Sequence, residues 1–473
     1  MTLDQRAAAS LVDTTWHDEI LPALRDFITI PNVSPAYDGG WARAGHMDAA
    51  VALVSQWCAA RPIPGLQIDV QRLPGRTPLI VVDIPATGDG RPDDTAVLYG
   101  HLDKQPEMVG WRDGLGPWTP VLDGDRLYGR GGADDGYAGF AALTAVEALH
   151  AGGGAHSRLV VLIEASEESG SPDLPAHIDA LGDRLGEPSL VVCLDSGCPD
   201  YDRLWVTTSL RGNLTGTLSV DVLAEGVHSG TYGGVVPSSM RIVRLLLDRL
   251  EDARTGAILV PELNPPIPPD RIRAAERTAA ELDDVAEDPP LAPGMRLASD
   301  DSVELLLNKT WRPSLSYTGA AGFPPVERAG NVLRPRSSFK LSLRLPPTAD
   351  PTAATKAVRE ILETDPPYGA IVQFEADDPA PGWSAPSFAP WLDAALGEAS
   401  RSTFGAEYRT NGEGGTIPFM AMLGHRFPDA QFLVTGVLGP GSNAHGPNEF
   451  LHLPTARRIT SAVATVLDAH ARR

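Results

Sequence analysis

The chain has 473 residues, 42% of them hydrophobic, which is long enough for two domains with separate cores. Lys and Arg number 39 against 61 Asp and Glu, so the net charge is -22. Such an acidic chain repels nucleic acid and anionic membranes, and we expect neither as a partner.

The N-terminal segment lacks the basic stretch and apolar core of a secretory signal, and no apolar run is long enough to span a bilayer. Three cysteines occur: Cys58, Cys193 and Cys198. An odd and sparse set suits a reducing compartment better than a disulfide framework. The sequence therefore predicts a cytoplasmic protein.

The first part of the chain alternates apolar runs with a helix, as α/β domains do. Residues 95–100, 158–163 and 189–194 are typical of buried strands, and residues 138–150 of an amphipathic helix. A fourth apolar run lies at 431–437. Polar clusters follow all four runs. Ligands bind at the carboxyl ends of strands in open α/β sheets, so we expect these clusters to converge.

The middle of the chain has a different pattern. Residues 205–224 and 338–345 alternate like half-exposed strands, with a helical stretch at 240–252 between them. If the flanking segments share one site, this section is an inserted domain. We predict a catalytic domain in two parts, 1–211 and 384–473, around an inserted domain at 212–383.

The first two polar clusters follow the strand at 95–100. In His101-Leu102-Asp103, the imidazole and the carboxylate share one strand face, and the carboxylate could fix the tautomer for metal binding. In GRGGADDG, residues 129–136, glycines precede Asp134 and Asp135. A surface His beside an Asp, and a helix N-cap for the two aspartates, are the simpler interpretations. The glycines lack the dinucleotide-binding spacing.

The remaining clusters are acidic or contain a histidine. Glu164, Glu167 and Glu168 crowd three carboxylates after a strand, which is costly without a cation, although a solvated loop is an equal alternative. Asp195 follows the third apolar run and His445 the fourth. Two histidines, three carboxylates and a spare glutamate match what two adjacent divalent ions need. G-x-S-x-G and H-E-x-x-H motifs are missing.

These residues resemble the carnosinase-like dinuclear metallodipeptidases, whose wider relatives include aminoacylases, glutamate carboxypeptidases and succinyl-diaminopimelate desuccinylases. The resemblance implies an α/β, zinc-exopeptidase-like catalytic domain with an inserted α+β lid and dimerisation domain. The matching segments run in family order from residue 100 to 449: GHLDKQP, YGRGGADDG, EASEESGS, LDSG, GVHSGTYGG, WRPSLS, FKLSLRLPP, EGGTIP and HGPNE.

The resemblance also implies roles for residues of the catalytic domain. Two divalent ions per subunit are expected, zinc first, with manganese or cobalt as alternatives. Glu167 matches the general base that activates a water bridging the ions, and Asp103 matches the support of the first histidine. The implied ligands are His101, Asp134 and Asp195 for one ion, and Asp134, Glu168 and His445 for the other, with Asp134 bridging.

In the inserted domain, the resemblance implies that His228 contacts the substrate carbonyl oxygen in the site of the opposite subunit, which predicts a homodimer. Arg344 matches the residue that holds the substrate carboxylate. Glu413, Gly415 and Thr416 match the loop around the substrate's amino end. An ordinary surface histidine and a plain exposed arginine are the alternatives for His228 and Arg344.

The chain departs from the family pattern after the paired aspartates, where Gly136-Tyr137 replaces Lys-Gly. The resemblance further predicts a cis peptide bond between Asp134 and Asp135.

We expect a dipeptidase, because Glu413 suits a substrate with a free amine. An N-acyl-amino-acid amidohydrolase with the same dinuclear site is the alternative substrate class. A non-catalytic binding protein on the same fold is a third possibility, which the complete set of candidate ligands disfavours.

Overall fold

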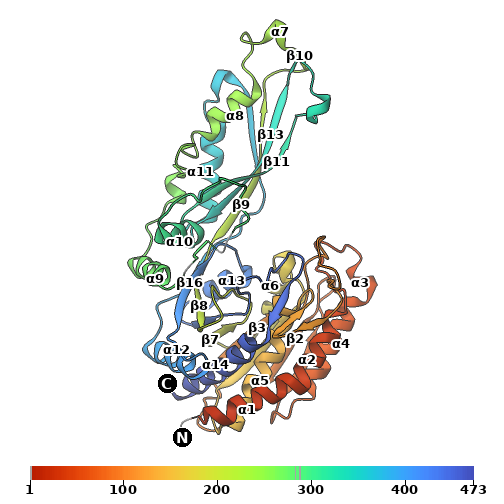
Figure 1. Cartoon of the computed structure of the whole chain (residues 1–473), viewed down its shortest axis with the longest axis vertical. Coiled ribbons are helices and arrows are strands. Elements are labelled where there is room, and N and C mark those ends of the chain that lie inside the picture. Colours follow the sequence, from red (N-terminus) through yellow and green to blue (C-terminus); the bar gives the residue numbers. More distant parts are fainter. Residues whose placement is uncertain (1–2, 283, 287–288) are drawn as a thin grey trace. The chain divides into compact units, whose positions relative to one another are not determined.

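The computed structural model describes residues 3–282, 284–286 and 289–473, and its chain divides into two compact units (Figure 1). Unit 1 comprises Met1–Thr208, Ala385–Asn411 and Pro418–Arg473. Unit 2 comprises Ser209–Ser384 and Gly412–Ile417. Unit 2 is therefore inserted into the sequence of unit 1, and the short segment 412–417 belongs with it.

Unit 1 is built on a six-stranded mixed sheet of order β1-β2-β6-β3-β7-β17. Strands β6, β3, β7 and β17 run parallel, and β2 is antiparallel to both of its neighbours. Every residue of β3 is buried, as expected for a central strand covered on both faces. The four predicted strands are confirmed. The strands are β1 (Gln67–Gln71), β2 (Leu79–Ile84), β3 (Thr95–His101), β6 (Arg158–Glu164), β7 (Pro188–Cys193) and β17 (Gln431–Val434).

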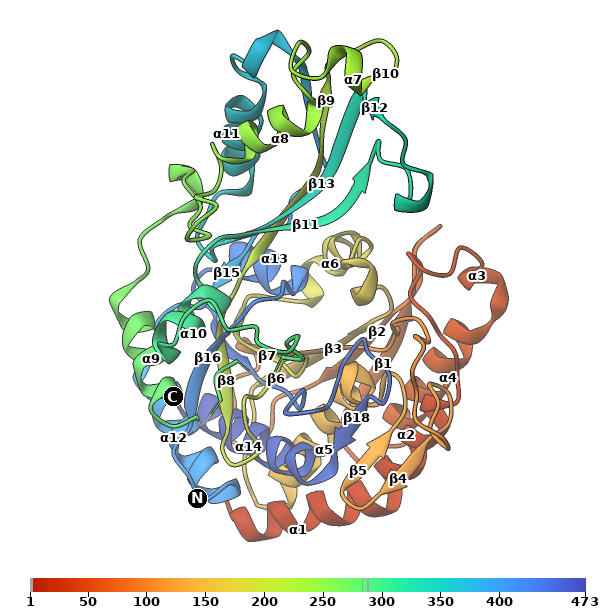
Figure 2. The same ribbon diagram turned by 45° about the horizontal axis from the view of Figure 1, so that its top comes forward.

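Helices cover both faces of this sheet (Figure 2). The apolar side chains of α1, α2, α4, α5, α12 and α14 form one core with one face of the sheet. On the other face, Phe419 of α13 stacks on Tyr99 of β3, with ring centroids 3.6 Å apart. The helices are α1 (Gln5–Thr15), α2 (Leu21–Ile28), α3 (Trp41–Ala44), α4 (His46–Ala59), α5 (Ala138–Ala151), α6 (Leu174–Leu181), α12 (Pro390–Thr403), α13 (Pro418–Arg426) and α14 (Leu453–Arg472).

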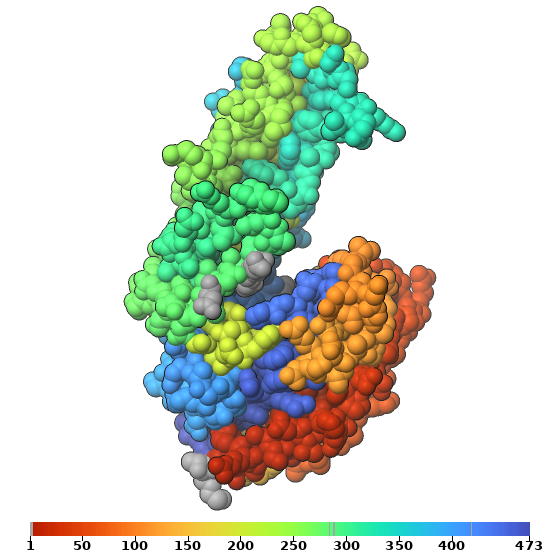
Figure 3. Space-filling model, viewed as in Figure 1, coloured from red at the N-terminus to blue at the C-terminus, as the bar shows by residue number. Residues whose placement is uncertain are grey.

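Helix α5 confirms the helix predicted at 138–150. It is buried along almost its whole length, because α1 and α14 cover the side that faces away from the sheet. The N-terminal helices in turn form part of the outer surface of unit 1, where they are drawn in red in Figure 3. A small sheet of order β18-β5-β4 completes the unit beside the loop at 129–136. Its strands are β4 (Val121–Asp123), β5 (Arg126–Tyr128) and β18 (Phe450–His452).

Unit 2 contains a four-stranded antiparallel sheet of order β11-β13-β9-β14. Burial alternates residue by residue along β9, which confirms the half-exposed pattern for residues 212–221, whereas residues 205–210 of the same predicted stretch are fully buried. The apolar sides of α8 and α11 pack on this sheet around Leu218, Leu343 and Val358. The strands are β9 (Gly212–Asp221), β10 (Val227–His228), β11 (Ser314–Ala321), β12 (Val332–Leu333), β13 (Arg336–Leu345) and β14 (Ile371–Ala376).

The helices of unit 2 include α8, which begins one residue before the helical stretch predicted at 240–252 and ends at Leu247, earlier than expected. They are α7 (Ser229–Tyr232), α8 (Ser239–Leu247), α9 (Pro269–Ala279), α10 (Ser302–Thr310) and α11 (Pro351–Glu363). A further sheet has the order β15-β8-β16, with β8 (Trp205–Leu210), β15 (Trp383–Ser384) and β16 (Arg409–Glu413). Among the described residues, no helix is both long and apolar enough to cross a membrane.

Candidate metal centre

The polar clusters of the sequence meet at the carboxyl edge of the central sheet. His101 is the last residue of β3, and Glu167 and Glu168 follow the end of β6. Asp195 lies two residues beyond β7. Because these three strands are parallel neighbours, their ends bring the side chains together, and the expected convergence is found.

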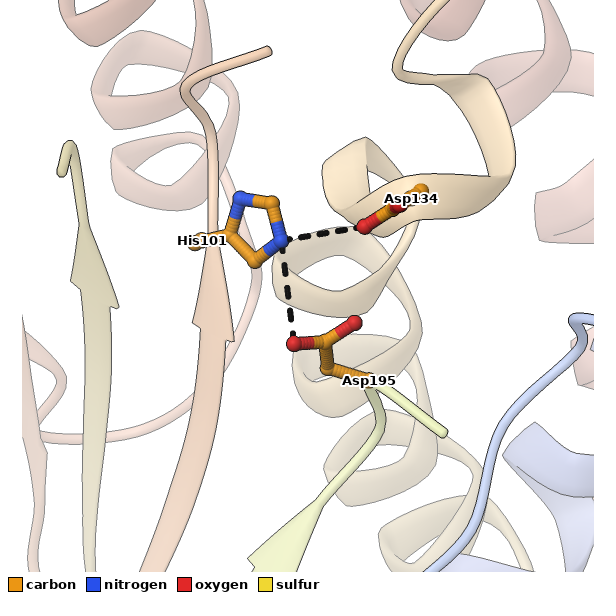
Figure 4. Close-up of side chains that lie close together, drawn as sticks. All are labelled: His101, Asp134 and Asp195. Carbon is orange, nitrogen blue, oxygen red and sulfur yellow. Dashed lines mark hydrogen bonds and ion pairs between the residues drawn. The ribbon is translucent and has the colours of Figure 1, made fainter. Parts of the chain in front are cut away.

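His101, Asp134 and Asp195 form the first group of potential ligands, with all three side chains buried (Figure 4). His101 Nε2 lies 3.2 Å from Asp134 Oδ1 and 3.7 Å from Asp195 Oδ2. On the other side of the ring, Nδ1 lies 3.1 Å from the backbone oxygen of Asp103, to which it can donate. In that tautomer the lone pair of Nε2 faces two carboxylates, an arrangement that a shared cation stabilises.

Asp134, Glu168 and His445 form the second group. His445 Nε2 lies 3.0 Å from Asp134 Oδ2 and 3.3 Å from Glu168 Oε2. Asp134 thus directs one carboxylate oxygen to each histidine, which is the geometry of a bridging ligand. Asp134 and Asp135 do not cap helix α5, whose first turn has no side-chain cap. The N-cap interpretation is wrong, and the predicted cis bond between them is confirmed.

Asp103 contacts the backbone of the acidic turn as well as His101, and the sequence predicted only the contact with His101. The fully buried carboxylate of Asp103 accepts hydrogen bonds from the backbone N–H groups of Glu167 and Glu168, both at 3.1 Å. These hydrogen bonds fix the acidic turn. Asp103 Oδ1 also lies 3.4 Å from His101 Nδ1. Glu167 Oε2 comes within 4.0 Å of His101 Nε2.

Sequence reasoning missed Gln105, whose amide donates to Glu168 Oε2 at 2.6 Å. Its position in the segment GHLDKQP, four residues after His101, was the available signal. It also missed the contacts of Tyr137, where the chain departs from the family pattern. The buried Tyr137 hydroxyl donates to the backbone oxygen of Leu194, directly before Asp195. Tyr137 thus ties the start of α5 to the end of β7.

The carboxyl groups of this centre are buried close to one another, which shifts their pKa values. Burial, followed by the charge of Asp195, raises the pKa of Glu167 well above its usual range. Burial and the neighbouring Asp134 do the same to the pKa of Glu168. Burial opposes ionisation of Asp134 too, but His101 and His445 lower its pKa below the ordinary value. Divalent cations would favour the ionised form of all three carboxyl groups.

The donor set fits two hard or borderline divalent cations. Within each group the candidate ligand atoms all lie within 4.8 Å of one another, and the two groups share Asp134. Glu168 Oε1 is buried and has no hydrogen-bond partner among the residues that the structure describes. Imidazole and carboxylate together suit zinc, manganese or cobalt.

The remaining candidate residues all belong to unit 2. His228 is exposed at the end of β10, and its Nδ1 accepts from the backbone N–H of Gly230 at 3.1 Å. Arg344 is half-buried on β13, opposite Asn213 of β9. Glu413 ends β16, and Gly415, which is exposed, and Thr416 follow in the next loop. The Glu413 backbone oxygen accepts from the Arg211 backbone N–H, and the Thr416 hydroxyl donates to the Arg211 backbone oxygen.

A scan against family models matches residues 97–469 to peptidase family M20/M25/M40. The chain is 28% identical over 437 residues to a cysteinylglycine-S-conjugate dipeptidase of Corynebacterium striatum, covering 89% of this chain and 90% of that protein. It is 27% identical over 438 residues to the human Beta-Ala-His dipeptidase, covering 86% and 81%. The crystal structure of human carnosine dipeptidase 1 superposes with a TM-score of 0.73 at 22% identity, covering 99% of both chains.

Proposed function

The chain belongs to peptidase family M20/M25/M40, as a metallodipeptidase of the carnosinase and Cys-Gly dipeptidase type, and we propose that it hydrolyses dipeptides with a free amino group at a centre of two divalent ions. One observation carries the proposal: Asp134 turns one oxygen toward His101 and the other toward His445. A bridging carboxylate between two His-containing ligand groups is what a dinuclear hydrolase requires.

We assign one ion to His101, Asp134 and Asp195 and the other to Asp134, Glu168 and His445. When bound, such ions polarise the substrate carbonyl and lower the pKa of water. Zinc is the first choice. Asp103 supports the centre by orienting His101 and by holding the backbone of the acidic turn.

Glu167 is the proposed general base. Its side chain is 12% exposed and approaches His101 without being a member of either ligand group. A glutamate beside the reacting water can accept one proton from it and later donate that proton to the leaving amine. The products are then a neutral amine and a carboxylic acid, and the acid releases its own proton to solvent.

Residues of unit 2 would recognise the substrate. Arg344 provides a guanidinium fork for the substrate carboxylate, and the loop of Glu413, Gly415 and Thr416 provides an acidic partner for the amino group. His228 would donate to the carbonyl oxygen, where negative charge develops. We further propose that His228 serves the centre of a second subunit in a homodimer.

Exposed apolar side chains of unit 2 support that dimer. Tyr232 ends α7, Val235 follows it closely, and Val332 begins β12; α7 and β12 both contact β10 (Figure 2). Tyr232, Val235, Phe323, Val326 and Val332 are between 41% and 86% exposed. Large exposed apolar surface of this kind marks an interaction site. The chain has three cysteines, all of them buried, and such a sparse, odd set supports the proposed cytoplasmic location.

Hydrolysis of matched substrates tests the substrate class. Metal-stripped protein resupplied with zinc or manganese is assayed against dipeptides and against the same dipeptides acetylated at the amino end. The proposal expects cleavage of the free-amine members only. Cleavage confined to the acylated members would transfer the assignment to an amidohydrolase, and no cleavage of either would contradict the enzymatic role.

A further inference from the structure

Arg130 and Glu449 form a buried ion pair between the two loops that carry Asp134 and His445. Arg130 Nη1 lies 2.5 Å from Glu449 Oε2, and the two side chains are 1% and 0% exposed. Each partner makes a second contact on the opposite loop. Arg130 Nη2 donates to the backbone oxygen of Gly446 at 2.7 Å, and Glu449 Oε1 accepts from the backbone N–H of Gly131 at 2.9 Å.

The loop that carries His445 has a backbone conformation that requires stabilising contacts. Asn443, His445 and Asn448 have φ angles of 54°, 64° and 64°, in the left-handed region that side chains other than glycine disfavour. A backbone of this kind persists only where surrounding contacts determine it. The guanidinium of Arg130 donates a hydrogen bond to the backbone carbonyl of Gly446, the residue that follows His445.

The ion pair also extends the hydrogen-bonded pairing of strand β18 with strand β5. Strand β18 pairs with β5 through Phe450 and Tyr128, and the N–H of Gly129 donates to the Glu449 backbone oxygen at 3.0 Å. Beyond that point the side chains of Arg130 and Glu449 continue the connection toward the two ligands. Burying two charges costs desolvation free energy, which their attraction offsets only where the geometry is good and further hydrogen bonds are made. Arg130 and Glu449 each make such a further hydrogen bond.

Two of the three ligands in the first group are held differently, while the third, Asp134, is shared with the second group. His101 ends β3, and Asp195 follows β7, two neighbouring strands of the central sheet. Their positions are fixed by the sheet, whereas the position of His445 depends on a loop. The two ions of the proposed dinuclear centre therefore depend unequally on the connection between Arg130 and Glu449.

We propose that Arg130 and Glu449 are positioning residues that keep His445 within reach of Asp134 and Glu168, and that they thereby set the affinity of the second ion selectively. The inference rests on the proposed dinuclear centre. Partners outside the ligand set that orient metal ligands typically change metal affinity by about 10–100-fold.

Zinc binding tests this selectivity without reference to activity. Zinc bound per chain is measured over a range of buffered free zinc for the wild type, Glu449→Gln and Arg130→Lys. We expect one site to keep its affinity in both variants while the other weakens by about tenfold or more. Arg130→Lys keeps the charge and nearly the size, so it remains informative if Glu449→Gln fails to fold.

Asp83→Asn is the matched control. Asp83 on β2 forms a bidentate ion pair with Arg158 on β6, also in unit 1. This substitution should leave both zinc sites unchanged. Wild-type affinity at both sites in folded Arg130→Lys, or equal weakening of both sites, would overturn the inference. A wild type that binds fewer than two zinc ions would instead contradict the dinuclear centre itself.

Discussion

Glu167 and Glu168 are adjacent in the sequence, yet their side chains have different surroundings. Glu168 Oε2 accepts from Gln105 and lies 3.3 Å from His445, whereas Glu167 points toward His101 from outside either ligand group. The backbone of both residues is fixed by Asp103. One glutamate can therefore bind a metal while its neighbour stays available for proton transfer.

Glu167→Gln should separate these two roles. Since the amide cannot accept the proton of the attacking water, we expect kcat to fall by a factor of about 10²–10⁴. Zinc content and KM should stay near the wild-type values, and Glu168→Gln is the contrasting variant, which should lose zinc. Steady-state kinetics and zinc analysis of both proteins measure this, and a kcat within a few-fold of wild type in Glu167→Gln would contradict the assignment.

Substitution of Arg344 should change KM, because its proposed role is to bind the substrate carboxylate. Burial lowers the pKa of its guanidinium, yet the group remains a cation at neutral pH. A charge-assisted hydrogen bond of about 1.5–3 kcal/mol corresponds to a factor of about 10–100 in binding. We expect Arg344→Met to raise KM for a dipeptide by that factor.

C-terminally amidated dipeptides provide the control for this role. The wild type should discriminate against the amide, and Arg344→Met should treat the free acid and the amide alike. Undiminished discrimination in the variant would show that another group recognises the carboxylate.

At the scale of elements, the sequence was most informative where periodicity and burial coincide. The apolar runs of β3, β6, β7 and β17 identified the central sheet because parallel strands are buried on both faces. The convergence of ligands followed from the common direction of those strands. Contacts between loops distant in sequence, such as that of Arg130 with Glu449, leave no periodic signal and could not be predicted.

The acidic residues at and after the end of β6 would make the proposed zinc binding dependent on pH. Burial, and then the charge of Asp103, raises the pKa of Glu164 from 4.5 to about 7, and the pKa values of Glu167 and Glu168 are raised as well. Carboxyl groups whose pKa is higher in the folded state stabilise the metal-free protein fully only below their unfolded pKa. For Glu164 that contribution is lost as the pH rises through about 7.

Bound zinc favours the ionised carboxylates and should reverse this loss. We therefore expect the increase in Tm on adding zinc to be larger at pH 7.5 than at pH 5.5. Thermal unfolding at both pH values, with and without zinc, measures it. An equal or smaller increase at pH 7.5 would show that the acidic turn does not hold the ions.

At the scale of the whole molecule, the proposed metal ligands belong to unit 1 and the proposed substrate-binding residues to unit 2. A homodimer in which His228 serves the opposite subunit would divide each active site between two chains. Mixing inactive His228→Ala and Glu167→Ala proteins should then restore activity, because some mixed dimers contain one complete site. Absence of rescue, with subunit exchange demonstrated by differently tagged chains, would contradict the shared site.

The most direct test of the dinuclear mechanism is the rate of dipeptide hydrolysis as zinc is added stepwise to metal-stripped protein, with bound zinc measured in the same samples. We predict that full activity requires two zinc ions per chain, because His101 and His445 belong to separate ligand groups joined by Asp134. Full activity with one bound zinc, or without any, would contradict that account.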